Sequence, residues 1–382
     1  MSWLVYSLTN SAFLLGVVAF SGLICNFIGA PFAGVLVDRL NRHRILLVTQ
    51  SLAMVQALIL AVIVLTGQAA VWNLILMSIM LGTINAFDMP ARQSFVVEMV
   101  DDREDLGNAI ALNSSLFNAA RLIGPTIAGI LVAAIGEGLC FLINGLSFIA
   151  VIACLLAMIL TPQVTSVEHP DFLKGLKEGL AYSFGFAPIK YIILLLTFTS
   201  LVAMPYTVLL PVFTREVLHG EASTLGYLTT GIGLGALTGA IYLASRKNVL
   251  GLGKMIVIAS FVFGLGLILA SFTDSLWLSL LPMALAGFGM VAMMAGCNTF
   301  LQTIADDDKR GRVMSLFVMS FMGLSPFGSL LYGAMADAVG APATFLTGGV
   351  LCVIGAAIFA WKFSSVRAVV HEAYVKKGIL VR

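Results

Sequence analysis

Long apolar stretches alternate with short polar turns along the whole chain, and this alternation limits the folds open to it. Apolar residues make up 60% of the 382 residues and charged residues only 10%, against about 25% charged residues in a soluble domain. A helix needs about 20 apolar residues to cross a bilayer. The sequence therefore predicts an all-α polytopic membrane protein. Its eleven predicted spans lie near residues 12–36, 45–66, 72–97, 107–135, 139–161, 187–213, 222–245, 255–273, 277–303, 311–337 and 342–363.

One polar segment divides these spans into two groups. Residues 162–186 contain prolines and acidic residues followed by the amphipathic piece FLKGLKEGL, which predicts a cytoplasmic linker with a helix on the membrane surface. The predicted organisation is an N-terminal bundle over 1–161, this linker, a six-helix C-terminal bundle over 187–363 and a cytoplasmic tail over 364–382.

The two groups of spans are related by an internal repeat. Trp72, Gly82 and Phe95 recur 205 positions later as Trp277, Gly287 and Phe300. Repeats of this length in a membrane protein are typical of transporters built from two related bundles. By the same repeat, the span 187–213 has only the stub MSWLVY as its counterpart in the first half. We therefore expect that a first helix is missing through truncation or a late start codon, or that the protein natively has eleven spans.

The stretch GVLVDRLNRHR, residues 34–44, sets the expected orientation in the membrane. Clustered Lys and Arg beside a span mark the cytoplasmic side. With this turn in the cytoplasm, 20 of the 21 Lys and Arg residues lie on or toward that side, and only Arg215 lies outside. The prediction is a protein of the plasma or inner membrane, with its N-terminus outside and its C-terminal tail inside the cell.

Several function classes find no support in the sequence. The four histidines stand alone in loops or the tail, and the five cysteines lie within apolar runs. Without an H-E-x-x-H motif or paired Cys/His spacing, no metal site is expected. Without a G-x-x-x-x-G-K-[ST] loop, the chain cannot itself use ATP. We expect no enzyme activity, no cofactor and, at a net charge of +2, no nucleic-acid partner.

The segment NAFDMPARQSFVVE, residues 85–98, carries the most ionisable groups of any predicted span. Such groups are costly within a bilayer and are usually functional. Asp88 and Arg92 are four residues apart and can pair on one helix face, and Gln93 is a neighbouring candidate for coupling or for lining a cavity. Two interpretations stay open: a proton- or substrate-responsive carboxylate, or a structural ion pair at the inner end of the bundle.

Polar residues in later spans are further candidates. Asn113, Asn118 and Arg121 lie at helical spacing on about one face, where they could line an aqueous cavity or hydrogen-bond a neighbouring helix. Asn298 and Gln302 are the main inward polar candidates of the second half, which has almost no buried charge. A cavity of this kind favours an organic, partly apolar substrate.

The charged turn resembles the signature loop of the major facilitator superfamily, G-x-L-a-D-r-x-G-r-k. Asn41 stands where that family usually has glycine, and asparagine is the other residue that tolerates a left-handed backbone. The residues that fall on the charged and glycine positions of the motif are Gly34, Asp38, Arg39 and Arg42.

Two further stretches carry the same resemblance. Gly124-Pro125 looks like the fifth-helix antiporter motif of the superfamily, G-P-x-x-G-G, with Gly129 one place late, and such pairs bend a helix. Residues 88–131 look like the branch that includes the enterobactin exporter and macrolide-efflux-type proteins.

The resemblance implies two six-helix bundles around a central cavity, which alternate between inward-open and outward-open states. It further implies proton-coupled export of small organic molecules, drug-like or siderophore-like, by a monomer in the lipid bilayer. The signature loop would be a conformational lock that meets the end of the eleventh helix near Arg310 and Arg312. Two alternatives stay open, namely a truncated, non-transporting remnant or scaffold, and a lipid-translocating member of the same fold.

Overall fold

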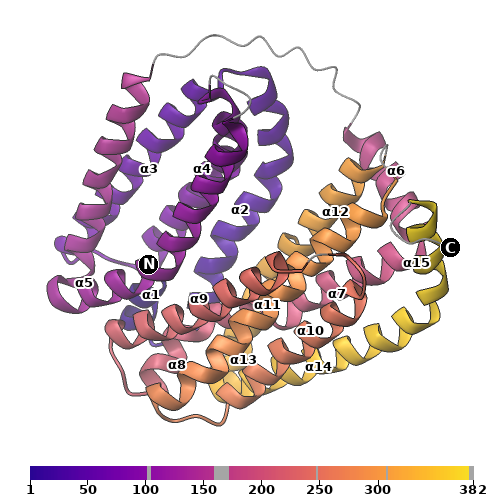
Figure 1. The fold of residues 1–382 in the computed structure, drawn as a ribbon. Helices are drawn as coiled ribbons and strands as arrows, with labels where there is room; N and C mark the ends of the chain where they lie inside the picture. Colours follow the sequence, from indigo (N-terminus) through magenta and orange to yellow (C-terminus); the bar gives the residue numbers. More distant parts are fainter. Residues whose placement is uncertain (101–104, 159–171, 247, 307–308, 378–382) are drawn as a thin grey trace. The chain divides into compact units, whose positions relative to one another are not determined.

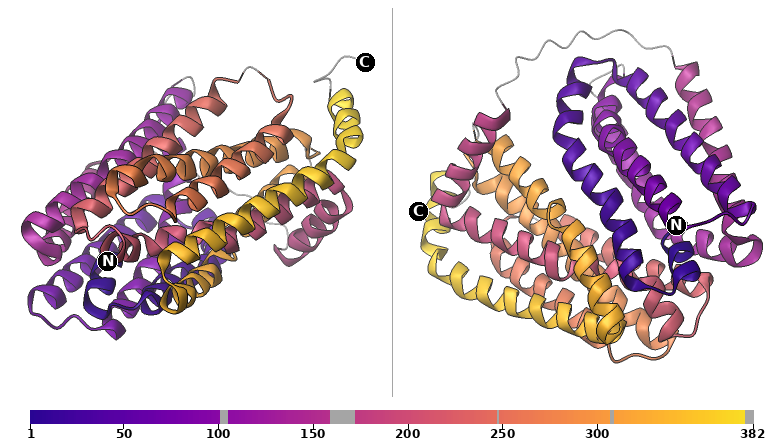
Figure 2. Two further views of the ribbon diagram at one scale, coloured as in Figure 1. Left: turned by 90° about the horizontal axis from the view of Figure 1, so that it is seen from below. Right: turned by 180° about the vertical axis from the view of Figure 1, so that it is seen from behind.

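The computed structural model describes residues 1–382 except 101–104, 159–171, 247, 307–308 and 378–382. The chain forms two compact units, Met1–Glu168 with His219–Tyr227, and His169–Leu218 with Leu228–Arg382. All regular secondary structure of the described residues is helical (Figures 1 and 2). Residues 162–171 of the predicted linker lie outside the described residues, and its amphipathic piece forms a helix, α6 (Phe172–Gly185).

The N-terminal unit is built from long helices joined by short turns. Serine and asparagine cap two of them: Ser11 accepts a hydrogen bond from the Leu14 amide at 3.2 Å, and Asn41 accepts one from the Arg44 amide at 3.0 Å. Asn41 has φ −66° and ψ 112°, so the expected left-handed backbone is not found and this residue acts as a helix cap. The helices are α1 (Ser2–Thr9), α2 (Ala12–Arg39), α3 (Arg42–Leu65), α4 (Val71–Glu98) and α5 (Leu106–Ala157).

The C-terminal unit holds the remaining helices. The predicted span 187–213 is divided into α7 (Ala187–Val202), the 3-10 helix η1 (Met204–Leu209) and α8 (Leu210–Glu216). The predicted span 311–337 is divided into α12 (Arg310–Met322) and α13 (Ser325–Val339), and Pro326 stands at the start of the second piece. The others are α9 (Ala222–Ala244), whose first residues group with the N-terminal unit, α10 (Leu252–Ala270), α11 (Leu276–Ile304), α14 (Ala341–Ser365) and α15 (Arg367–Lys376).

The described residues contain ten helical segments that are long and apolar enough to cross a membrane. One of them, Leu122–Ala157, has 36 residues, more than the 17–25 that one crossing needs. It contains Gly136, whose φ of 80° and ψ of 166° are not helical. The segment therefore joins two of the predicted spans, and the prediction of a polytopic all-α membrane protein is confirmed.

The internal repeat is visible in the backbone conformation. Gly136 within α5 and Gly340 between α13 and α14 share an unusual geometry, with φ 80° and ψ 166° at the first and φ 85° and ψ 160° at the second. Asn10 and His219 are the non-glycine residues of the described chain with positive φ, 47° and 48°, and they precede α2 and α9. The turn after α1 therefore corresponds to the turn after α8.

Substitution of Gly136 by alanine is expected to lower the free energy of unfolding by about 1–3 kcal/mol, because this backbone region is open almost only to glycine. An added Cβ would meet no atom within 4 Å, so the cost is that of the backbone alone. Gly124→Ala is the matched control, since Gly124 also has open space but lies in helical backbone. Thermal unfolding of the purified variants measures the difference. Equal melting temperatures would show that the turn does not require glycine.

Candidate functional site

Small residues bring α4 against α2 and so position the most polar part of the N-terminal unit. The Ser78 hydroxyl of α4 donates a hydrogen bond to the Val18 carbonyl oxygen at 2.7 Å. A Cβ added to Gly82 would overlap the backbone of Gly22. Contacts of this kind let two helix backbones approach closely, and they fix the turns of α4 that come just before Asp88.

Asp88 lies at the centre of a buried polar cluster between α3 and α4. The residue is 7% exposed. Its Oδ1 accepts hydrogen bonds from the Thr49 hydroxyl at 2.8 Å and from Gln50 Nε2 at 2.6 Å. Its Oδ2 accepts from Arg92 Nε at 3.2 Å and Nη2 at 2.8 Å. Both carboxylate oxygens are thus satisfied by donors, as a buried charge requires.

This geometry favours the structural interpretation of the Asp88–Arg92 pair. The carboxylate joins α4 to two consecutive side chains of α3, so it holds the two helices in register. The Arg92 side chain is 56% exposed and can be reached by solvent or by a ligand. Gln93 is exposed and makes no hydrogen bond among the described residues. Thr49 and Gln50 were missed by the sequence reasoning, although two adjacent polar residues in an apolar run are a recognisable signal.

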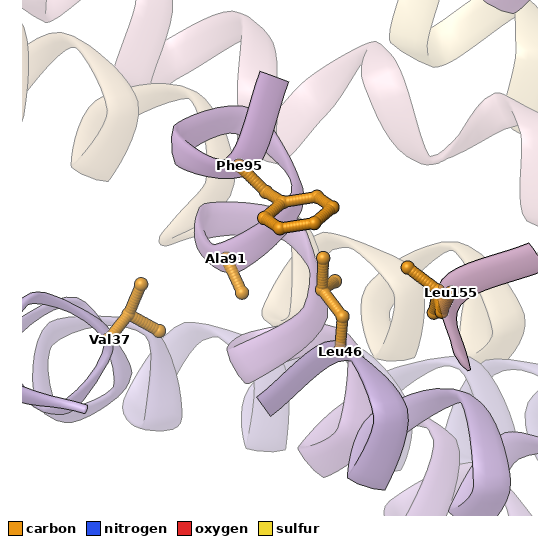
Figure 3. Close-up of a cluster of buried hydrophobic side chains, with 5 residues drawn as sticks. All are labelled: Val37, Leu46, Ala91, Phe95 and Leu155. Carbon is orange, nitrogen blue, oxygen red and sulfur yellow. The ribbon is translucent and has the colours of Figure 1, made fainter. Parts of the chain in front are cut away.

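A cluster of apolar side chains packs next to these polar groups and joins the ends of four helices. Figure 3 shows the Phe95 ring over Leu46, with Val37 and Leu155 on either side. His43 adds to this packing, since its ring lies 5.8 Å from the Phe95 ring and its Nε2 lies 2.7 Å from the Leu155 carbonyl oxygen. The turn between α2 and α3 is therefore anchored to the end of α5.

A cavity of about 610 Å³ lies beside the Asp88 cluster, between α2, α3 and α4. Thr49 lines this cavity and also bonds Asp88, so the two features share a wall. Asn41 and Arg44 form a polar end, and the remaining walls are mainly aliphatic with one aromatic ring. The volume falls within the range of small-molecule sites, roughly 300–1,000 Å³. The cavity suits a partly apolar organic molecule with one polar or anionic group.

The predicted polar residues of the second half come together near the end of α11. Gln302 Nε2 donates to Asn298 Oδ1 at 2.6 Å on an exposed face, and Arg310 Nε donates to the Gln302 carbonyl oxygen at 3.1 Å. Arg312 Nη1 lies 2.7 Å from Glu178 Oε2, in an ion pair that lacks the alignment of a hydrogen bond. These contacts tie α11 and α12 to each other and to α6. The predicted contact of Arg310 and Arg312 with the signature loop stays a prediction.

Other predicted site residues are placed only in part. Asn113 is exposed on α5, so its role in a cavity stays a prediction. Arg42 is half-buried at the start of α3. Outside the described part of the structure lie the side chains of Asp38, Arg39, Asn118 and Arg121, and the surroundings of Gly34.

The Gly124-Pro125 pair does not interrupt α5. The helix keeps helical dihedrals through Pro125 and departs from them at Gly136. A Cβ at Gly129 would come 2.6 Å from the Ala222 carbonyl oxygen and 3.0 Å from the Gly226 Cα. Gly129 therefore lies at a close contact between α5 and the start of α9.

The described residues contain no group of three metal-binding side chains. The geometry is that of a helical membrane protein with cavities and buried polar contacts. The sequence profile of the major facilitator family described as transmembrane secretion effector matches residues 1–374. The chain belongs to this family. Its members are transporters and not enzymes, so the transporter class and the superfamily predicted from the signature loop are both confirmed.

Curated relatives cover nearly the whole transporter. The Staphyloferrin A transporter of Staphylococcus aureus is 27% identical over 92% of this chain and 89% of its own. The multidrug efflux pump Tap of Mycolicibacterium fortuitum is 25% identical over 90% and 86%. Macrolide efflux protein A of Streptococcus pyogenes is 24% identical over 90% and 86%. These names, a siderophore transporter and two efflux proteins, confirm the predicted likeness to this branch of the superfamily.

Solved structures show the same fold. The crystal structure of a mutant of the nucleoside transporter NupG superposes with a TM-score of 0.73 at 15% sequence identity, over 95% of this chain and 94% of its own. At this identity, the likeness shows that the chain has the major facilitator fold.

Proposed function

We propose that this transporter exports small, partly apolar organic molecules by alternating access and draws its energy from the proton gradient. The observation that carries the proposal is the aliphatic cavity with Asn41 and Arg44 at one end. The names of the relatives support it, because they describe a siderophore transporter and two efflux proteins. The absence of an ATP-binding loop from the sequence favours an ion gradient as the energy source.

Inside-out membrane vesicles provide the direct test. Vesicles with and without the protein are energised and offered a macrolide, a carboxylate siderophore and a fluorescent organic dye. We expect uptake of at least one compound above the level of vesicles without the protein, and we expect a protonophore to abolish it. Uptake that resists the protonophore would overturn proton coupling alone. No uptake of any compound, with the protein inserted in normal amounts, would favour the scaffold alternative.

The signature loop gives a second expectation. Asp38→Asn should slow transport about fivefold at unchanged protein abundance, since the lock assignment gives Asp38 one charge contact that biases a closed state of the transporter, and a single ion pair contributes up to about 1 kcal/mol. Asp274→Asn is the matched control, because Asp274 is an exposed carboxylate on the turn between α10 and α11. Initial rates in the same vesicles measure both. Equal initial transport rates in the two variants would show that Asp38 does not contribute to the conformational lock.

A further inference from the structure

A second cavity lies at one end of the C-terminal unit, and none of its lining residues belongs to the candidate site described above. It has a volume of about 500 Å³ and is enclosed by the start of α10, the end of α14 and α15. Figure 1 shows α14 leading into α15 close to the C-terminus. The cavity has no counterpart among the predicted site residues, so its lining indicates what could occupy it.

The inner wall of this cavity is aromatic. Phe300 is 1% exposed, and its ring lies 5.7 Å from the Phe363 ring and 6.5 Å from the Tyr374 ring. Gly253 makes room for this group, because a Cβ at that position would overlap the Phe363 ring. An apolar chain is the complementary occupant for such a wall.

The rim of the cavity carries two positive charges, on Lys254 and Arg367, and the imidazole of His371. Lys254 of α10, and Arg367 and His371 of α15, line it and are exposed. No carboxylate is among the lining residues, and none of these three side chains forms an ion pair with another described residue. The first turn of α10 also lines the cavity, and no side chain caps it. A helix N-terminus adds partial positive charge and free amide donors to the rim.

One hydroxyl on the lining has no hydrogen-bond partner among the described residues. The Tyr374 side chain is 4% exposed, and its hydroxyl makes no hydrogen bond within the described part of the chain. Burial raises the pKa of this phenol to about 12, so it remains a hydroxyl that can donate to an anion. A ligand oxygen in the cavity can accept a hydrogen bond from this hydroxyl.

Residues beside the cavity place its mouth at the level of lipid head groups. Trp361 is 69% exposed, and the Lys362 ammonium lies 4.3 Å above its ring. Tryptophan and lysine at the end of a span are typical anchors at the membrane–water interface. The adjacent α14 turn supplies Phe363 and Ser364 to the cavity, so the cationic rim lies where phosphate groups of the bilayer are found.

We propose that this cavity binds one anionic phospholipid, with its phosphate among Lys254, Arg367 and His371 and an acyl chain against Phe300 and Phe363. A lipid fits better than a soluble anion, because the aromatic wall would otherwise stay unoccupied beside the membrane. The site would attach α15 to the ends of α10 and α14 in membranes that contain such lipids.

Fluorescence quenching in vesicles tests the proposal. A variant of the full chain with Trp3→Phe, Trp72→Phe and Trp277→Phe keeps Trp361 as its single tryptophan. It is placed in phosphatidylcholine vesicles that contain equal fractions of brominated phosphatidylglycerol or brominated phosphatidylcholine. We expect brominated phosphatidylglycerol to quench the Trp361 fluorescence more than brominated phosphatidylcholine does. The binding constant of phosphatidylglycerol relative to phosphatidylcholine should be several-fold above one. Lys254→Gln and Arg367→Gln should each lower this relative binding constant about fivefold, or down to one where the preference is smaller than that. This is the effect of one basic residue near anionic lipid.

The controls separate this site from general surface charge. Lys177→Gln removes a positive charge from exposed α6, outside the cavity, and should leave the ratio unchanged. In the protein that keeps Lys254, Arg367 and His371, a relative binding constant near one overturns the proposal. This outcome needs no rim variant, so misfolding of a variant cannot hide it. An equal loss in Lys177→Gln would also overturn it. Displacement of the lipid by millimolar inorganic phosphate would assign the site to a soluble anion instead.

Discussion

Replacement of Asp88 by alanine is expected to lower the free energy of unfolding by about 3 kcal/mol, the lower end of the cost of breaking a buried pair. The Gln50 amide would then be buried without its acceptor, and the link from α3 to Arg92 would be lost. The cost stays at the lower end because Arg92 is 56% exposed and can be hydrated. The Thr49 hydroxyl, which has one hydrogen, can then donate it to the Leu46 carbonyl oxygen, 3.1 Å away.

Thermal unfolding of the purified protein measures this effect, and two variants frame it. Asp88→Asn keeps the size and one accepting oxygen, so we expect about half the loss of Asp88→Ala. Gln93→Ala changes an exposed residue of the same helix and should leave the melting temperature within the error of the measurement. A melting temperature of Asp88→Ala equal to that of Gln93→Ala would contradict the structural role given to the carboxylate.

Local patterns were enough to predict part of this cluster. The Asp88–Arg92 pair follows from a spacing of four residues on one helix. The bonds from Thr49 and Gln50 cross 39 and 38 positions of the sequence, so they depend on how α3 packs against α4. Without an observed rotation of each helix, a polar residue in an apolar run cannot be matched to its partner.

The same distinction holds for the fold. The spans were predictable because the length of a crossing helix is fixed by the bilayer, and the turn at Gly136 falls between two predicted spans. The contacts of the second half were not predictable, since Tyr182 bonds Asp306 and Arg312 pairs with Glu178 across more than a hundred residues. The family resemblance implies that Arg312 meets the signature loop of the first half, and this contact stays a prediction beside the described ion pair of Arg312 with Glu178 of α6.

The repeat offers the sharpest comparison between the two halves. Gly82 of α4 and Gly287 of α11 are 205 positions apart, and each faces the backbone of a neighbouring helix. A Cβ at Gly82 would overlap the carbonyl oxygen of Gly22, and one at Gly287 would overlap that of Ile232. The sequence showed this glycine only as one position of the internal repeat. The structure shows that it allows the same close approach of two helix backbones within each unit.

Gly82→Ala and Gly287→Ala are each expected to lower the free energy of unfolding by about 3 kcal/mol, the upper part of the usual cost of overpacking. A backbone carbonyl cannot rotate away as a side chain can, so the helices must separate. Gly231→Ala is the matched control, because its Cβ would meet the flexible end of the Leu280 side chain at 3.2 Å, which can move away.

Membrane abundance and thermal unfolding of the purified protein measure these three variants and the Gly82→Ala/Gly287→Ala double variant. The two sites lie in different units and share no described partner, so their losses should add. We expect the double variant to be recovered poorly or not at all, and Gly231→Ala to behave like the original protein. If Gly82→Ala unfolded at the original temperature while Gly287→Ala did not, the two halves would pack by different rules despite their shared glycine.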